Sequence, residues 1–312
     1  MTTPSVQTRI TEMLGIEKPI IQAAMGWIAR SQLSSAFSNA GGMGIIETSS
    51  GELDVIREEI KKMKTLTDKP FGVNVAQAFV RDPDIVQFII DQGIKFVTTS
   101  AGDPMKYTAL LKEAGLTVFH VVPSFSGALR AIEAGVDGLI VEGGEGGGFK
   151  NPKDVASMVL LPQVCESVDV PVVAAGGITD GRTMAAAFAL GAEGVLMGTR
   201  ILSSAESPVH QNWKDAIVSA DSTDTVFLNR SGPGPAVRAL RTERSTRIQK
   251  EGTENIIGEL ADILKVYFEG DLEAGLALTG QVAGRIHEVK PVAQIFEETL
   301  AQYHAVISRL PK

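Results

Sequence analysis

Cysteine and histidine are scarce in this sequence of 312 residues, which contains one cysteine, Cys165, and four histidines. A single thiol excludes an internal disulfide and is typical of a reducing compartment. Without a Cys, His or Asp spacing of the kind that ligates metals, the sequence predicts no metal site. Cys165 itself, within LLPQVCESV, is expected to be a small buried residue.

Basic charge and long apolar runs are also lacking. The net charge is −8 and the pI is near 5.2, which argues against a nucleic-acid partner because such binding depends on clustered Lys and Arg. The one basic cluster, RALRTERSTR, is either a solvated helix face or an anion contact. No apolar run approaches the roughly 20 residues of a membrane span, and MTTPSVQTRITEML lacks the apolar region of a secretory signal. We expect a cytoplasmic protein without membrane or nucleic-acid partners. Whether it forms a homo-oligomer is left open by the sequence.

Short apolar runs alternate with amphipathic stretches over the first 200 residues. Near-continuous apolar strands separated by helices indicate a parallel sheet covered on both faces. Eight such units favour an α/β fold of the (β/α)₈ TIM-barrel type over an open doubly wound sheet. The first strand also lacks the glycine fingerprint of an open dinucleotide-binding sheet. The expected strands lie within 19–25, 43–48, 71–76, 96–102, 117–124, 138–144, 170–177 and 194–200.

After residue 200 the regular alternation stops. We expect residues 1–207 to form the barrel, and residues 208–284 to form a helical cap over its mouth, inserted after the eighth strand. Residues 285–312 contain an amphipathic stretch, VAQIFEETLAQYHAVISRL, that is expected to form a helix packing back on the barrel.

Glycines follow the seventh and eighth expected strands, where barrel enzymes often bind phosphate. The backbone N–H groups of glycine turns can face an anion, and a helix N-terminus adds a favourable dipole. The alternative is that these glycines serve only tight turns between strand and helix. Two such turns at the two standard positions favour phosphate binding by Gly176, Gly177, Gly198 and Thr199.

The other strand ends carry residues suited to the rest of a phosphorylated ligand. Small apolar side chains follow the first strand, an amide ends the third and a carboxylate ends the sixth. The small side chains suit a flat ring, the amide suits a ring edge of mixed polarity, and the carboxylate suits a hydroxylated chain. The glycine-rich stretch VEGGEGGGFKN then leaves room for the ring or is a flexible loop. Phosphate, hydroxylated chain and flat ring together indicate FMN, bound by Ala23, Ala24, Met25, Asn74, Glu142, Gly147, Gly148 and the two glycine turns.

The chain as a whole resembles the nitronate monooxygenase (2-nitropropane dioxygenase) family, which includes flavin-dependent enoyl-acyl-carrier-protein reductases and related quinone reductases. The resemblance implies an FMN-dependent oxidoreductase in which Met25, Asn74, Glu142 and the two glycine turns lie against the flavin or its phosphate. It rests on RITEMLGIEKPIIQAAMGW, SNAGGMGII, LTDKPFGVN, AAGGITDGR, GAEGVLMGTR, AVRA and LTGQVAGRI.

The sequence departs from that family pattern at two places. Ala23 and Ala24 stand where the family usually has two glycines, and Phe149 stands where the motif E-A-G-G-H has the histidine that the family uses near the flavin. A general base must reach the proton that it removes, and a phenylalanine cannot accept one. The departure therefore argues most against oxidation of neutral nitroalkanes and least against oxidation of nitronates, which are already deprotonated.

Catalytic residues are otherwise undetermined by the sequence. His120 lies inside the fifth strand and reaches the barrel interior only if its face, shared with Val118 and Val122, points inward. It is either a neutral core histidine or a substitute acid. The sequence favours a nitronate monooxygenase-like enzyme acting on a small molecule. The alternatives are an NAD(P)H-dependent reductase of enoyl thioesters or quinones, and a flavin-bearing partner subunit that has lost turnover.

Overall fold

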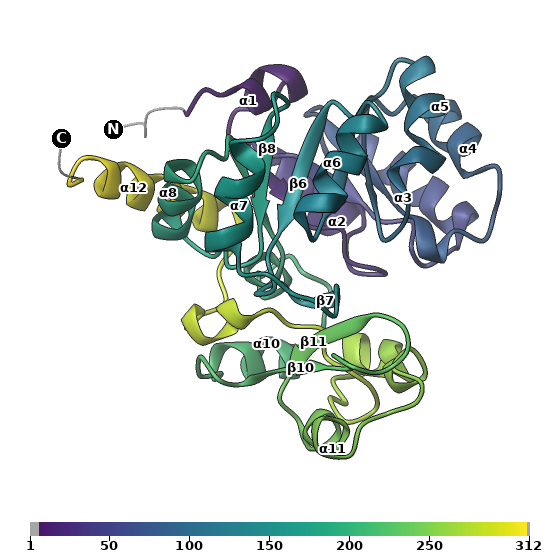
Figure 1. The fold of residues 1–312 in the computed structure, drawn as a ribbon, viewed down its shortest axis with the longest axis vertical. Coiled ribbons are helices and arrows are strands. Elements are labelled where there is room, and N and C mark those ends of the chain that lie inside the picture. The colour runs from purple at the N-terminus through teal and green to yellow at the C-terminus, as the bar shows by residue number, and fades with distance from the viewer. Residues whose placement is uncertain (1–5, 311–312) are drawn as a thin grey trace.

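The computed structural model describes residues 6–310, so residues 1–5 and 311–312 of the predicted segments lie outside the described residues. A parallel sheet of eight strands forms the centre of the larger part (Figure 1). Its order is β1-β9-β8-β6-β5-β4-β3-β2. Neighbouring strands follow one another in the chain, apart from the excursion of β7 and the pairing of the first strand, β1, with the last, β9. The strands are β1 (Ile20–Gln22), β2 (Gly44–Ile46), β3 (Phe71–Ala76), β4 (Phe96–Ser100), β5 (Thr117–Val122), β6 (Gly138–Glu142), β8 (Val172–Ala175) and β9 (Gly194–Met197).

A single parallel bridge between Ile21 and Met43 closes the sheet into a barrel. On either side of it the Gln22 N–H donates to the Met43 carbonyl at 3.0 Å, and the Met43 N–H donates to the Ile20 carbonyl at 2.9 Å. This closure confirms the (β/α)₈ barrel expected from the eight apolar runs. All eight strands fall within the predicted stretches.

Helices surround the barrel and α1 covers its N-terminal end (Figure 1). Two of these helices begin with a hydrogen-bonded capping box, in which Thr8 caps α1 and Asp180 caps α8. The outer helices are α1 (Arg9–Leu14), α2 (Ser31–Asn39), α3 (Leu53–Leu66), α4 (Ile85–Asp91), α5 (Thr108–Glu113), α6 (Phe125–Glu133), α7 (Ser157–Cys165), α8 (Gly181–Ala189), α9 (Thr199–Leu202) and α12 (Val292–Ile307), with 3₁₀ turns η1 (Gln77–Phe79) and η2 (Pro104–Lys106).

Two apolar clusters stabilise the barrel. One fills its interior, where the rings of Phe96 and Phe119 meet edge to face at 5.2 Å beside Ile140. The other lies between the strands and the helices and includes Val118 and Val122. Because both faces of each strand are buried, the strands show no alternation of apolar and polar residues.

The cap lies beyond the C-terminal ends of the barrel strands (Figure 1). It holds strands as well as the predicted helices: a three-stranded antiparallel sheet of order β10-β11-β7 has its own apolar core around Val226, Val237 and Ile248. The glycine-rich stretch supplies β7, so one strand of this sheet comes from the region predicted as barrel. The elements are β7 (Gly148–Lys150), α10 (Gln211–Val218), β10 (Thr225–Leu228), β11 (Ala236–Leu240), α11 (Glu243–Glu251), η3 (Gly258–Leu260), the π-helix η4 (Lys265–Glu269) and η5 (Gln281–Arg285).

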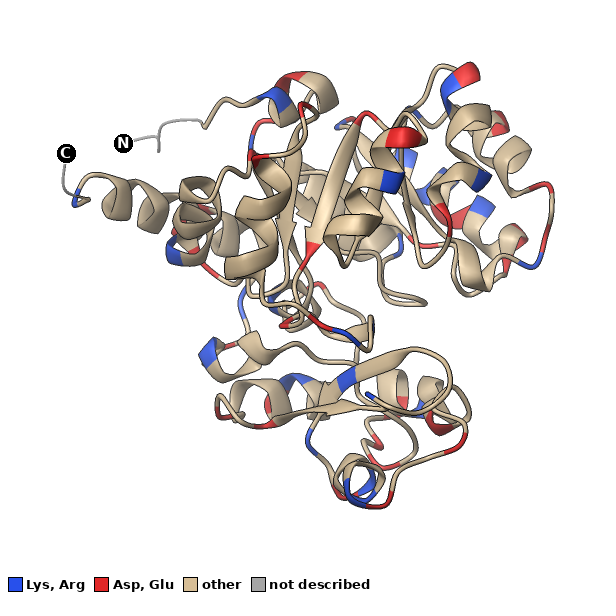
Figure 2. Ribbon diagram, viewed as in Figure 1, with Lys and Arg blue, Asp and Glu red and all other residues tan. Residues whose placement is uncertain are grey.

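The helix α12 returns to the barrel, where it packs along α8 and also contacts α2 (Figure 1). Acidic and basic residues are interspersed over both barrel and cap (Figure 2). Among residues 6–310, no helix has the length and apolar character needed to cross a membrane. The domain limits at residues 207 and 284 stay a prediction.

Candidate active site

The turn after β8 holds two glycines in the left-handed region, Gly176 at φ 80° and Gly177 at φ 77°. A Cβ on Gly176 would lie 2.9 Å from the carbonyl oxygen of Gly143, so that glycine is required by the neighbouring backbone. A Cβ on Gly177 would meet only ordinary contacts, with the Ser157 hydroxyl at 3.7 Å. The space beside Gly177 is therefore the more open part of the predicted phosphate turn.

The turn after β9 lies next to the end of β1. The Ala23 N–H donates to the Met197 carbonyl at 3.0 Å, and a Cβ on Gly198 would lie 3.5 Å from the Ala23 Cβ. The fold thus brings Ala23 and Gly198 together, as the flavin prediction requires. The Thr199 hydroxyl accepts the Gly280 N–H at 2.9 Å, so part of its hydrogen-bonding capacity is used inside the protein.

Asn74 lies on β3 with its side chain toward the barrel interior near the mouth. Its amide nitrogen donates to the Thr98 hydroxyl at 2.9 Å and to the Thr98 carbonyl at 3.1 Å, both on β4. Its backbone carbonyl accepts the Thr48 hydroxyl at 2.7 Å. Only 4% of Asn74 is exposed, so these bonds hold the amide in one orientation at the strand end.

Glu142, at the end of β6, forms an ion pair with Lys150 of β7. The Lys150 side chain is 3% exposed and the Glu142 side chain 24% exposed. The sequence analysis expected Glu142 to accept ligand hydroxyls and did not identify Lys150. A buried ammonium is stable only beside an anion. The Lys150 ammonium therefore helps to fix the orientation of the Glu142 carboxylate.

The glycine-rich stretch makes room for the protein's own chain. A Cβ on Gly147 would lie 2.7 Å from both the Gly280 nitrogen and the Thr279 carbonyl carbon. The neighbouring Gln281 N–H donates to the Glu145 carbonyl at 2.9 Å. Gly147 is therefore needed for contact with residues 279–281, a cause that the prediction of a flavin contact did not consider. Gly148, at φ 81°, has open space instead, with the nearest atom of Leu278 at 3.9 Å.

Phe149 joins the barrel mouth to the cap. Phe149 pairs with Val237 of β11 in the cap sheet. Its ring lies 5.3 Å from the ring of Phe79, which ends η1 just beyond β3. An apolar aromatic pair therefore occupies the position at which the resemblance implied a histidine.

His120 does not face the barrel interior. Its neighbour Phe119 lies inside the barrel, whereas Val118 and Val122 pack between strands and helices. The condition under which His120 would reach the barrel interior is therefore not met; the sequence left it open because the strand is buried on both sides. The His120 ring nitrogen Nδ1 lies 2.7 Å from the Thr99 hydroxyl. Burial lowers the pKa of His120 to about 4, so the ring is neutral at physiological pH.

Gln77 is a polar residue at the mouth that the sequence analysis missed. It begins η1, directly after β3, and is 6% exposed, yet among residues 6–310 neither its amide oxygen nor its amide nitrogen has a hydrogen-bond partner. Buried amides without partners are costly. Together with the open sides of Gly177 and Gly198, this amide fits a ligand that carries both donors and acceptors. A single glutamine gives no sequence signal of this kind.

Within residues 6–310, no cluster of three or more His, Cys, Asp and Glu side chains is placed to hold a metal ion. The strand ends instead carry glycine turns, a fixed amide and an aromatic wall. In a (β/α)₈ barrel this is the end at which enzymes bind and transform their ligands. Fold and site together define a barrel enzyme with an organic ligand or cofactor at its mouth.

The sequence profile of the nitronate monooxygenase family matches residues 7–84 and 76–302. The chain belongs to this family, and it is a flavin-dependent oxidoreductase. A probable nitronate monooxygenase of Staphylococcus saprophyticus is 33% identical over 284 residues, covering 76% of this chain and 79% of that protein. This assignment confirms the resemblance drawn from the sequence motifs.

Other relatives act on different substrates. A (3aS,4S,5R,7aS)-5-hydroxy-7a-methyl-1-oxo-octahydro-1H-indene-4-carboxyl-CoA dehydrogenase of Mycobacterium tuberculosis is 40% identical over 247 residues, covering 78% of this chain and 69% of that protein. The solved structure of FabK from Thermotoga maritima is 42% identical with a TM-score of 0.91, covering 98% of both chains. A nitroalkane oxidase structure from Streptomyces ansochromogenes is 25% identical with a TM-score of 0.83, covering 97% of this chain and all of that one.

Proposed function

We propose that this protein is an FMN-dependent oxidase of preformed alkyl nitronates, with molecular oxygen as co-substrate. A bound flavin supplies two-electron redox chemistry. The turns at Gly177 and Gly198 are suited to its phosphate and to a close approach of its ring, and the Asn74 amide is suited to the ring edge. The open side of each glycine and the unpartnered Gln77 amide support this placement.

One observation carries the choice of a nitronate: the Phe79–Phe149 pair lies at the position where the family motif has a histidine. Neither ring accepts a proton, and His120 is directed away from the barrel interior. A neutral nitroalkane must lose a carbon-bound proton before it is oxidised, and a general base has to reach that proton. A nitronate has already lost it, so an apolar wall suffices.

A second candidate is an NAD(P)H-dependent oxidoreductase of acyl thioesters. The specific observation in its favour is sequence identity: the chain is 42% identical to FabK and 40% identical to the CoA-thioester dehydrogenase, compared with 33% to the probable nitronate monooxygenase. In this reading Phe79 and Phe149 form an apolar wall for the acyl group. Lys150, which forms an ion pair with Glu142, supplies a positive charge at the same end of the barrel.

The decisive experiment records the flavin absorption spectrum without oxygen. NADH, NADPH and a preformed alkyl nitronate are each added to the purified protein. We expect bleaching with the nitronate and colour recovery on admitting oxygen. Bleaching with NADH or NADPH alone, followed by reoxidation with an enoyl thioester, would instead establish the second candidate. Analysis of the cofactor released on denaturation checks the remaining point, since we expect FMN and not FAD.

Location in the cytoplasm remains part of the proposal. It is supported by the single cysteine of the sequence, Cys165, which excludes an internal disulfide and is typical of a reducing compartment. A homo-oligomer remains a prediction that size-exclusion chromatography with light scattering can test.

A further inference from the structure

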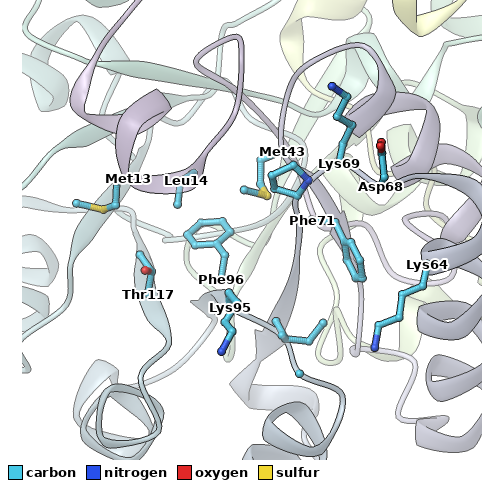
Figure 3. Close-up of a pocket in the computed structure, with 13 residues that line it drawn as sticks. Met13, Leu14, Met43, Lys64, Asp68, Lys69, Phe71, Lys95, Phe96 and Thr117 are labelled. Atoms are coloured by element: carbon cyan, nitrogen blue, oxygen red, sulfur yellow. The ribbon is translucent and has the colours of Figure 1, made fainter.

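Lysines lie at both ends of the barrel, but they differ in burial. At the N-terminal ends of the strands, the hollow in Figure 3 is bordered by Lys64, Lys69 and Lys95, which are all exposed to solvent. Ammonium groups in that position are hydrated and need no further explanation. At the opposite end, the Lys150 side chain is only 3% exposed and forms an ion pair with Glu142. A lysine is rarely buried to this extent, so Lys150 calls for a reason.

The fold leaves room for this ion pair. A Cβ on Gly146 would lie 2.6 Å from the Lys150 ammonium nitrogen and would also clash with the Glu142 carboxylate. Within residues 6–310, the ammonium makes no hydrogen bond to any other group. A buried ion pair adds little net stability, because the desolvation of two charges offsets their attraction. The pair is therefore better explained by a role in ligand binding than by stabilisation of the fold.

Glu142 lies beside the turn that is predicted to bind phosphate. Ile140, two residues earlier in β6, belongs to the cluster inside the barrel, so Glu142 lies on the strand face directed to the barrel axis. Glu142 is in register with Ala175 of β8, and the Gly143 N–H donates to the Ala175 carbonyl at 3.0 Å. Gly176 follows directly. A carboxylate without a counter-charge at this place would repel a phosphate group in the turn.

Two other carboxylates close to this turn are compensated within the protein. Asp180 caps the N-terminus of α8 and is paired with Arg285 at 2.6 Å. The carboxylate of Glu145 accepts the first backbone N–H of α7 at 3.0 Å, at the end of the helix where the dipole is positive. Lys150 gives Glu142 a counter-charge of the same kind. The acidic side chains around the turn are thus balanced before any anion binds.

We propose that Lys150 is a charge-compensating residue for the cofactor phosphate. Its ammonium cancels the charge of Glu142, so that a phosphorylated flavin binds next to a carboxylate that is suited to the hydroxyl groups of the same cofactor. Lys150 thereby selects FMN over riboflavin, which lacks the phosphate. This inference rests on the FMN cofactor of the proposed function and is independent of the substrate that the enzyme oxidises.

Titration of the full-length, flavin-free protein with FMN and with riboflavin, followed by flavin fluorescence, tests this role. The measured quantity is the riboflavin Kd divided by the FMN Kd. Damage to the fold or to the shared ring contacts changes both constants together and leaves this ratio unchanged. We expect Lys150→Met to lower the ratio at least about tenfold, because it removes a cation near a phosphate in a partly buried site of low effective dielectric constant.

Further variants complete the charge cycle. Glu142→Gln should raise the ratio, because it leaves Lys150 without its counter-charge beside the phosphate. The double variant Lys150→Met/Glu142→Gln should have the wild-type ratio, since both charges are gone, and Lys150→Arg should keep it because the cation remains. Lys153→Met is the matched control: Lys153 lies in the same loop but is exposed to solvent, and its removal should leave the ratio unchanged.

The opposite signs of the two single variants decide the outcome. An unchanged ratio in Glu142→Gln would overturn the inference even if Lys150→Met failed to fold, and so would a lowered ratio in both single variants. Wild-type protein that binds riboflavin as tightly as FMN would overturn it as well. A protein that shows the expected ratios but does not oxidise nitronates would contradict only the proposed substrate. A nitronate oxidase with the same ratio in every variant would contradict only the role of Lys150.

Discussion

Two alanine substitutions, Gly147→Ala and Gly198→Ala, distinguish glycines that the protein needs for its own packing from glycines that a ligand would contact. Gly147→Ala places a Cβ 2.7 Å from the backbone of Thr279 and Gly280, which has nowhere to move without breaking its bond to Thr199. Gly198→Ala places a Cβ 3.5 Å from the Ala23 side chain, which is an ordinary contact. The first change strains the protein, and the second alters only the wall that faces the predicted flavin.

The expected magnitudes differ accordingly. Overfilling a tightly packed site costs about 1–3 kcal/mol, so Gly147→Ala should lower the free energy of unfolding of the flavin-free protein by that amount. With a denaturant dependence of about 2–3 kcal/mol per molar urea, its midpoint should fall by roughly 0.3–1.5 M. Gly198→Ala should leave that midpoint nearly unchanged. One methyl group in a ligand contact is worth about 1–3 kcal/mol, so its FMN affinity should fall about tenfold or more.

Urea unfolding followed by circular dichroism and FMN titration followed by fluorescence measure the two quantities on the same samples. Each variant serves as the control for the other. Wild-type stability in Gly147→Ala would show that residues 279–281 do not pack against the glycine-rich stretch. Wild-type FMN affinity in Gly198→Ala would remove the flavin from the turn after β9.

Two further substitutions probe histidine chemistry. The pKa of His120 falls from 6.5 to about 4 on folding, so the unfolded chain binds the proton more tightly, and the loss of stability grows as pH falls from 6.5 to 4, reaching on the order of 3 kcal/mol. His120→Gln should remove this pH dependence from urea midpoints while turnover stays within a few-fold; a fall of roughly 100-fold in turnover would make His120 a proton donor or acceptor. Phe149→His should add nitroalkane oxidation that rises with pH as the imidazole, with an ordinary pKa near 6.5, becomes a free base. Efficient oxidation of neutral nitroalkane by wild type, measured by oxygen uptake, would contradict that reasoning.

The barrel was predictable because each of its strands is a separate apolar run followed by a helix. The placement of Ala23 and Gly198 at the same end of the barrel also followed, since the carboxyl ends of parallel strands meet there, but their direct contact was not predicted. The orientation of His120 did not follow. A strand buried on both faces has no polar side, so nothing in TVFHVVPS shows which residues face the interior.

The cap sheet was missed for a different reason. Its strand β7 is three residues long and follows a run of glycines, which are depleted in strands. Its partner β11 lies more than 80 residues later, and pairing at that distance leaves no periodic signal in either segment. The Glu142–Lys150 pair was missed with it, because only the turn between β6 and β7 brings these side chains together.

The route of the chain through β7 has a consequence for exchanging parts between relatives. The cap sheet takes one strand from residues 148–150 and two from beyond residue 224. No continuous segment therefore contains the whole sheet without also containing barrel strands. A chimera that imports residues 208–284 alone would pair a foreign β11 with the native β7 and a foreign Thr279–Gly280 with the native Gly147. A cap transplanted together with the segment 143–150 should retain its fit, whereas one transplanted without it should not.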